Sequence, residues 1–184
     1  MSRSSEPRRR RSSGNANGVR RRGRYERGQE IVELVLVLPF LLVMVFGILE
    51  FGHLFDVDQS LTSLSREGAN IASRGTPLDT VVQVTLANGA QINLAGFGGA
   101  IASQLTVQNG VPMVSAQLAS AGISVVSSRI GPVGAPANTL GGYTFADGKN
   151  YYIVELFYDY QPFTPLKRLV QGIVPDTIYD RAMF

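Results

Sequence analysis

A run of 19 residues, Ile31–Leu49, contains a single charged side chain, Glu33, and this run constrains the chain more than any other feature. As an α-helix it would be about 28 Å long, which matches a bilayer hydrocarbon core of roughly 30 Å. A helix of this length in a soluble protein normally carries a polar stripe, and none is visible here. The sequence therefore predicts a membrane-spanning helix over residues 29–50.

Positive charge is concentrated on the N-terminal side of this run. Residues 1–28 contain ten Arg and two Glu and carry a net charge of +8, whereas residues 29–184 carry −5. The first segment also has almost no apolar side chains, so the sequence predicts a disordered basic leader there. Because basic residues that flank a span stay on the cytoplasmic side, we expect the leader in the cytoplasm and the remainder of the chain beyond the membrane.

The helix is predicted to continue past the membrane. Over residues 51–75, apolar or small residues recur at spacings of three and four while polar residues occupy the other faces, which is typical of an amphipathic helix. Gly75 and Pro77 then end it. Pro39 lacks a backbone donor and predicts a kink within the span. We expect the membrane-distal half of the apolar stripe to pack under a sheet. The stripe consists of Leu54, Val57, Leu61, Leu64, Gly68 and Ile71.

Residues 76–184 are predicted to form a small head with an antiparallel sheet, so the predicted fold class is α+β, with a long N-terminal helix packed on the head. The strongest strand signal lies in Asn150–Tyr160, where two sets of side chains alternate along the segment. One set is Tyr152, Val154, Leu156, Tyr158 and Tyr160, and the other is Tyr151, Ile153, Glu155, Phe157 and Asp159. Thr177–Phe184 and Ile123–Arg129 are predicted as further strands. Gly131–Gly142 is rich in Gly, Pro, Ala and Asn and predicts a loop.

Three other segments of the head carry weaker signals. Asn88-Gly89 lies between two segments with alternating apolar positions, Thr80–Ala87 and Ala90–Leu94, and predicts a two-residue hairpin turn. The alternative for this segment is a short helix capped by Asp79. Phe97–Val107 is predicted as a short helix. Leu166–Gly172 is predicted as a short helix or a turn.

Four small residues on the predicted long helix would allow another element to approach it closely: Gly47, Gly52, Gly68 and Ala72. The Gly68-x-x-x-Ala72 spacing is typical of helix–helix contacts in membranes. The alternative for this pair is contact with the protein's own sheet. The sequence leaves both interpretations open.

Composition argues against an enzyme. With no Cys and one His, the chain excludes thiol chemistry, disulfides and multi-His metal sites within one chain. A hydrolase triad would have to use His53, which lies on the predicted helix and not in a cleft. Asp56 and Asp58 lack the further acids and the glycine of a Ca²⁺ loop. We therefore expect no enzymatic activity, cofactor, metal or small-molecule substrate. His53 is interpreted as a solvated surface residue, with a pH-sensitive contact as the alternative.

The Arg-rich leader could also indicate nucleic-acid binding. No aromatic platform or folded basic domain accompanies it in the sequence, and attraction to anionic inner-leaflet lipid explains the same charge. We therefore expect the membrane, and no nucleic acid, as the partner of the leader.

Several segments resemble one known family. Three of them lie on the predicted long helix: Arg27-Gly-Gln-Glu-Ile-Val-Glu-Leu-Val-Leu-Val-Leu-Pro39, Gly47-Ile-Leu-Glu-Phe-Gly52 and Ser65-Arg-Glu-Gly-Ala69. Two lie near the C-terminus: Tyr158-Asp-Tyr-Gln-Pro-Phe-Thr-Pro-Leu166 and Asp180-Arg-Ala-Met183. Together they are similar to the TadE-like family of minor pilins, or pseudopilins, of bacterial tight-adherence (Tad, Flp-type) type IVb pilus systems.

The resemblance implies a type IV prepilin signal, in which Gly28 is followed five residues later by Glu33. A prepilin peptidase would cut between Gly28 and Gln29, since a glycine leaves the backbone unobstructed there. The new α-amine of Gln29 would then pair with Glu33 of a neighbouring subunit, because a carboxylate inside hydrocarbon is costly without a partner. The alternatives are an uncleaved signal anchor, and a Glu33 side chain that reaches the interface beside Arg27.

The function that the resemblance implies is structural. The chain would be a minor pilin or pseudopilin of a Tad pilus or a related secretion system, made in the bacterial inner membrane with a cytoplasmic N-terminus and a periplasmic head. The implied partners are the prepilin peptidase, other TadE-like or TadF-like pseudopilins, the major pilin and the inner-membrane pilus platform. The alternative is an uncleaved single-span anchor that carries a periplasmic binding module.

Overall fold

A computed structural model describes residues 19–138, 140–165, 172 and 175–184, with side chains from residue 28 onward. The chain divides into two compact units, Met1–Val45 and Phe46–Phe184. One long helix, α1, runs over Val19–Ser73 and so contributes residues to both units. The predicted continuous helix is therefore present.

In the first unit, α1 is exposed on all sides. Every residue from Gly28 to Val45 is exposed to solvent. The helix from Gly28 onward is long and apolar enough to cross a membrane, which supports single-pass anchoring. Pro39 lies inside this helix, and α1 continues through it.

The start of α1 differs from the disordered leader that the sequence predicts. The helix begins at Val19, so residues 19–28 are helical. Arg is a good helix former, and extending an existing helix costs far less than nucleating one, which accounts for this extension. The rest of the predicted leader, residues 1–18, lies outside the described residues.

In the second unit, the last part of α1 packs against the head through the predicted apolar stripe. Val57 and Leu61 are completely buried, and Leu64 is nearly so. Beyond Ser73 the chain turns at Gly75, whose positive φ of 87° suits a glycine at the end of a helix. The prediction that the membrane-distal half of the stripe packs under the sheet is confirmed, and Val57 and Leu61 extend this packing toward the membrane.

A second helix, α2 (Leu78–Asn88), occupies the place of the predicted hairpin. The hairpin is wrong because the apolar positions follow a helical period: Val81, Val82 and Thr85 form the buried face. The helical alternative is confirmed, although Asp79 lies in the first turn and does not cap it. A 3-10 turn, η1 (Gly89–Ile92), and a single helical turn, α3 (Leu94–Phe97), follow.

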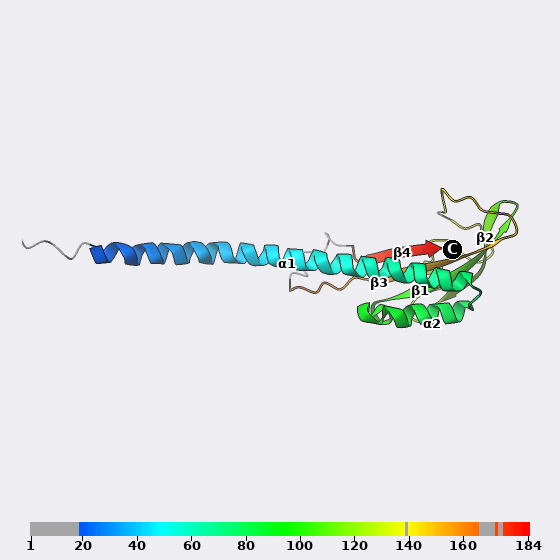
Figure 1. The fold of residues 1–184 in the computed structure, drawn as a ribbon, viewed down its shortest axis with the longest axis horizontal. Helices are drawn as coiled ribbons and strands as arrows, with labels where there is room; N and C mark the ends of the chain where they lie inside the picture. Colours follow the sequence, from blue (N-terminus) through cyan, green and yellow to red (C-terminus); the bar gives the residue numbers. More distant parts are fainter. Residues whose placement is uncertain (1–18, 139, 166–171, 173–174) are drawn as a thin grey trace, which may run out of the picture. The chain divides into compact units, whose positions relative to one another are not determined.

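The head contains a four-stranded antiparallel sheet in the order β2-β1-β3-β4 (Figure 1). Its strands are β1 (Gly98–Gln108), β2 (Val111–Ala119), β3 (Asn150–Asp159) and β4 (Thr177–Met183). The α+β fold class is confirmed, and so are the two strands predicted at residues 150–160 and 177–184.

Two predictions in the middle of the head are wrong. Phe97–Val107 is not a helix: it belongs mainly to β1, which lies between β2 and β3. Residues Gly99–Ser103 are all buried, so the alternation that reveals a strand is absent from this sequence. Ile123–Arg129 is not a strand but an irregular segment around the 3-10 turn η2 (Val125–Ser127).

A tight turn at Asn109-Gly110 joins β1 to β2, a strand that the sequence did not predict. Both turn residues have positive φ, 54° and 77°, as a two-residue turn of this kind requires. The predicted loop at Gly131–Gly142 is confirmed for its described residues, which leave out residue 139, apart from an isolated bridge between Met113 and Pro136. Of the segment Leu166–Gly172, only Gly172 lies within the described residues.

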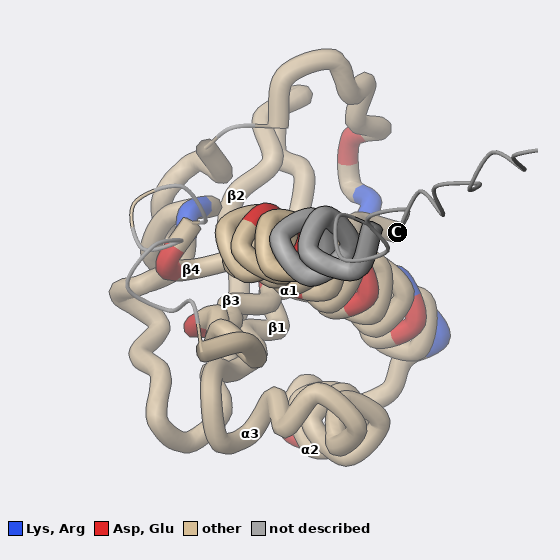
Figure 2. The backbone as a smooth tube through the Cα atoms, turned by 90° about the vertical axis from the view of Figure 1, so that its left-hand side faces the viewer, with Lys and Arg blue, Asp and Glu red and all other residues tan. Residues whose placement is uncertain are grey.

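Two apolar clusters cover the two faces of the sheet. The larger one joins α1 and α2 to the same face, which places both helices on one side of the strands (Figure 2). Its members include Val57 and Leu61 of α1, Val81 of α2, and Val154 and Leu156 of the sheet. The smaller cluster covers the opposite face and consists of Leu105, Val114, Ile130, Leu140 and Ile153.

Candidate functional site

The predicted cleavage residues lie in the exposed part of α1. Gly28 and Gln29 are exposed, and a side chain added at Gly28 would meet nothing within 4 Å. Both residues are helical, with α1 beginning nine residues earlier at Val19. The structure thus leaves this bond sterically open, and cleavage stays a prediction.

Glu33 is exposed on the first unit of α1. Within the part of the chain that the structure describes, its carboxylate has no hydrogen-bond or ion-pair partner. A carboxylate inside an apolar run requires such a partner in a bilayer. Any partner must therefore come from residues outside the described side chains, from lipid headgroups or from another chain.

The four small residues of α1 fall into two pairs. Side chains added at Gly47 and Gly52 would meet nothing within 4 Å. A side chain added at Gly68 would lie 2.7 Å from Oγ1 of Thr85 on α2 and 3.3 Å from Val154 on β3. Ala72 is buried in the same apolar cluster. Gly68 and Ala72 therefore contact the protein's own head, which is the alternative that the sequence left open for them.

The most organised polar site in the second unit is centred on Glu50, which the sequence did not single out as a site residue. Glu50 follows the apolar run directly and is only 1% exposed. Its Oε1 accepts hydrogen bonds from the Tyr160 hydroxyl at 2.7 Å and the Phe163 backbone N–H at 3.3 Å. Its Oε2 accepts the Thr164 backbone N–H at 3.0 Å. All these donors come from the segment that follows β3.

Tyr160 closes this site from the sheet side. Its hydroxyl also reaches the backbone carbonyl of Glu50, at 3.3 Å. Burial, together with the hydrogen bond to Glu50 and the charge of that carboxylate, raises the pKa of Tyr160 well above its usual range. The hydroxyl is therefore held as a neutral donor, which suits a buried carboxylate.

His53 lies one turn after Glu50 and packs beside the same segment. Its ring is 5.7 Å from the ring of Tyr160 and 6.0 Å from that of Phe163, measured between centroids. The histidine is half-buried, unlike the fully solvated residue that the sequence predicts. Together, Glu50 and His53 fix residues 160–164 against α1.

This arrangement is a structural latch, which we call the Glu50 latch: the Glu50 carboxylate and its donors Tyr160, Phe163 and Thr164. A hydrogen bond to a charged group contributes about 1.5–3 kcal/mol to stability, so the three together fix the C-terminal segment firmly. The sequence contained a signal for it. Glu50 lies in one of the family-like segments, Gly47–Gly52, and its donors lie in another, Tyr158–Leu166.

A second buried carboxylate, Glu155 on β3, plays the same part on the other face of the sheet. It is fully buried and accepts hydrogen bonds from the Arg129 backbone N–H at 2.9 Å, the Tyr179 hydroxyl at 2.8 Å and the Ser128 hydroxyl. Burial and the charge of Glu155 raise the pKa of Tyr179 well above its usual range. The guanidinium of Arg129 lies 4.0 Å from the centre of the Tyr179 ring. This cluster fixes the segment around η2 onto the sheet.

Neither carboxylate is placed for metal binding. Across the described ranges, no group of three or more His, Asp or Glu side chains could hold a metal ion. Each carboxylate instead accepts one tyrosine hydroxyl and at least one backbone N–H from a connecting segment. Both sites therefore organise the head.

The comparisons with known proteins bear on α1. Residues 28–70 match the family model of TadE-like protein. No curated protein and no solved structure matches the chain. The matched residues begin at the predicted cleavage glycine and contain Glu33, the whole apolar run, Glu50 and Gly68. The resemblance to the TadE-like family is therefore confirmed over residues 28–70, and this match supports a protein associated with the Tad pilus.

Proposed function

We propose that this chain is a minor pilin or pseudopilin, a non-enzymatic structural component of a Tad (type IVb) pilus or a related secretion system. The observation that carries the proposal is the family match over residues 28–70, which coincides with α1 from the predicted prepilin signal to the head. The first part of this helix is fully exposed and free to pack against other helices, while its last part is built into the head.

The first step in the proposed function is processing by a prepilin peptidase after Gly28. The open surroundings of Gly28 support this step, since a peptidase must reach the backbone there. The mature product would comprise residues 29–184 and begin at Gln29. Its net charge would change from +3 to −5, so the cut removes the basic character of the precursor. The leader would thus set the orientation in the membrane and then be discarded.

The second step is assembly through Glu33. An exposed carboxylate near the start of an apolar run is unfavourable in a bilayer. The α-amine created at Gln29 of a neighbouring subunit would supply the missing positive charge in a low-dielectric helix bundle. The partners would be other TadE-like or TadF-like pseudopilins, the major pilin and the inner-membrane pilus platform.

The proposed topology follows from charge. The +8 leader holds the N-terminus in the cytoplasm, so the head would lie in the periplasm after a single crossing of the inner membrane. A reporter fused after Phe184 that is active only in the periplasm should then be active. Activity of only a cytoplasmic reporter would reject this orientation.

Intact-mass measurement of protein from cells with an active cognate prepilin peptidase tests the proposed function. We expect a product that begins at Gln29. Gly28→Leu should abolish this product, because a bulky side chain would occupy the peptidase site, whereas Gly23→Leu in the leader should leave it unchanged. If the full-length species dominates while the same peptidase processes another pilin, the uncleaved anchor with a periplasmic binding module becomes the better account.

A further inference from the structure

The exposed apolar surface of α1 continues beyond Glu50 by more than one turn. Ile48, Phe51 and Phe55 are 69%, 51% and 69% exposed, and their spacing of three and four residues places them in one stripe. After Phe55 every exposed residue of α1 is polar: Asp56, Asp58, Gln59, Ser63, Arg66, Glu67 and Ser73. The surface of the helix therefore changes sharply from apolar to polar at Phe55.

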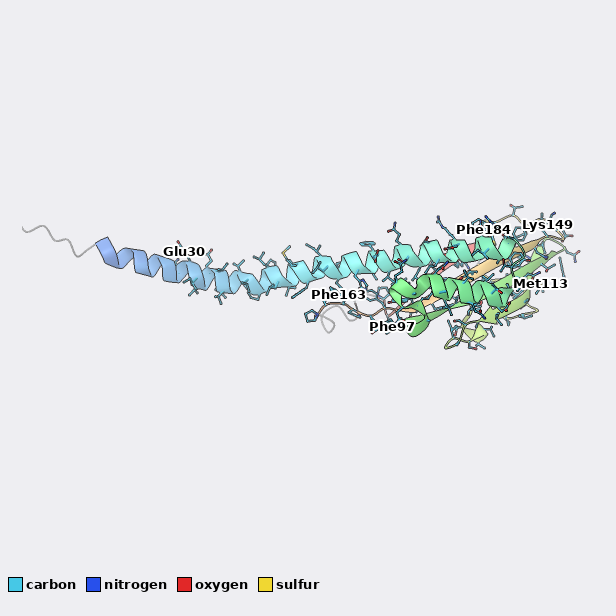
Figure 3. All side chains as sticks on the ribbon, turned by 60° about the horizontal axis from the view of Figure 1, so that its bottom comes forward. Glu30, Phe97, Met113, Lys149, Phe163 and Phe184 are labelled. Carbon is cyan, nitrogen blue, oxygen red and sulfur yellow. The ribbon has the colours of Figure 1, made fainter. Side chains whose placement is uncertain are left out.

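Phe163 adds an exposed aromatic ring near the same level from a distant part of the chain. Its backbone is tied to Glu50, yet its side chain is 71% exposed. Figure 3 shows it at the end of the head where α1 enters. Its ring neighbours His53, which is two residues from both Phe51 and Phe55 and hence about 200° from them around the helix. Exposed aromatic rings thus flank α1 on opposite sides.

This distribution favours a lipid surface over a protein partner as the occupant. A single protein partner covers one side of a helix. The boundary of a bilayer instead surrounds the helix, so aromatic rings on opposite sides of α1 at one level fit a plane across the helix axis. Trp and Tyr gather at such planes in membrane proteins, and Phe is among the residues by which interfacial helices enter the boundary between headgroups and acyl chains. The plane lies directly after the apolar run, at the level of Glu50. Because Glu50 is buried and hydrogen-bonded within the head, it presents no charge to lipid there.

The length of the helix agrees with this placement. From Ile31 to Phe55, α1 extends for about 36 Å. This exceeds the hydrocarbon core of roughly 30 Å but lies within the 40–45 Å that includes the headgroup regions. Phe55 therefore reaches the headgroup region when the apolar run spans the core.

We propose that Phe51, Phe55 and Phe163 form an aromatic collar that rests in the headgroup–acyl boundary of the leaflet on the side of the head. The collar and the Glu50 latch then set the height of the head above the bilayer while the subunit is in the membrane. The inference rests on α1 spanning a bilayer, and it is independent of cleavage after Gly28 and of pairing at Glu33.

Tryptophan fluorescence of the full chain in lipid vesicles tests the collar directly, because the sequence contains no Trp. Phe55→Trp and Phe163→Trp each introduce a single reporter at an exposed position. Phe184→Trp is the matched control: it is 48% exposed and lies toward the opposite end of the head (Figure 3). The vesicles contain phosphatidylcholine brominated on the acyl chain, either close to the headgroup or close to the chain end.

We expect the two collar variants to lose most of their fluorescence, with stronger quenching from bromine close to the headgroup, and Phe184→Trp to retain its fluorescence. Quenching of Phe163→Trp that only equals that of Phe184→Trp would overturn the proposal and leave the ring for a protein partner. Phe55→Trp tests the same plane from a different segment, so a folding defect in one variant does not decide the outcome. The measurement uses no peptidase and no pilus partner, so it is separate from the test of the proposed function.

Discussion

The carboxylate of Glu50 and the hydroxyl of Tyr160 lie 2.7 Å apart although 110 residues separate them in the chain. Glu50 is the first residue after the apolar run, and Tyr160 directly follows β3. Their contact therefore joins the base of the head to the helix at the point where the predicted span ends.

Glu50→Ala should destabilise the head by about 2–5 kcal/mol, because it removes the carboxylate that accepts from the Tyr160 hydroxyl, the buried Thr164 N–H and the part-buried Phe163 N–H. Urea unfolding of the full chain in detergent, followed by circular dichroism, measures this loss. Asp56→Ala is the control: an exposed acid on the same helix, whose removal should change stability by no more than about 0.5 kcal/mol. Equal stability of the two variants would contradict a structural role for the latch.

Alkaline pH should weaken the head through Tyr160 and Tyr179. Both have a pKa raised by burial and by a neighbouring carboxylate. Above about pH 10 an unfolded tyrosine releases its proton, whereas these two retain theirs in the folded state. The free energy of unfolding should therefore be unaffected by these groups below about pH 10 and should decrease as the pH rises further.

The double variant Tyr160→Phe and Tyr179→Phe tests this pH dependence. It should be less stable than the parent at neutral pH, because two hydroxyl groups no longer donate to buried carboxylates. It should also lose less stability between pH 9 and pH 11 in thermal unfolding. A parallel decline in the double variant and the parent would show that other groups cause the alkaline loss.

The sequence predicted two elements from their periodicity. The stripe from Leu54 to Ile71 has one buried face and is confirmed as part of α1. The two alternating sets of large side chains in β3 are confirmed as a strand, although Ile153–Leu156 are buried on both faces of the sheet. β1 was wrongly predicted as a helix because the run Gly99–Ser103 is buried throughout and consists mainly of small residues, so no strand period is visible. Two Asn-Gly pairs lie in the head, and only one of them forms a hairpin turn: Asn109-Gly110 joins β1 to β2, whereas Asn88-Gly89 lies at the end of α2.

The Glu50 latch could be predicted only in part. From sequence alone, a charged residue at the end of an apolar run is expected to lie at the membrane interface. No feature of the residues near Glu50 indicates that residues 160–164 contact it. Long-range contacts of this kind depend on the strand order, which places β3 between β1 and β4. The two family-like segments that meet here were the available signal, but similarity alone did not show that they touch.

Gly68→Ala should destabilise the head by about 1–3 kcal/mol. The added methyl group would lie 2.7 Å from Oγ1 of Thr85, whose hydroxyl is already bonded to the Val81 carbonyl at 2.8 Å. Gly52→Ala is the matched control on the same helix, where the methyl group meets nothing and removing a glycine should stabilise by up to about 1 kcal/mol. Thermal unfolding that ranks Gly68→Ala at or above Gly52→Ala would contradict the tight packing of α1 on α2.

Glu33→Ala and Glu33→Gln should leave membrane insertion intact, since both remove the single charge in the apolar run and Glu33→Gln also keeps the length of the side chain. Both should reduce co-purification with pilus partners, because they remove the carboxylate proposed to pair with a neighbour's α-amine. Glu30→Gln is the matched control: an exposed acid three residues earlier on α1, at the edge of the apolar run. More pilus partner should co-purify with the parent and with Glu30→Gln than with the two Glu33 variants. Equal losses in all three variants would indicate a general effect of charge near the membrane, and normal assembly of both Glu33 variants would remove this residue from the mechanism.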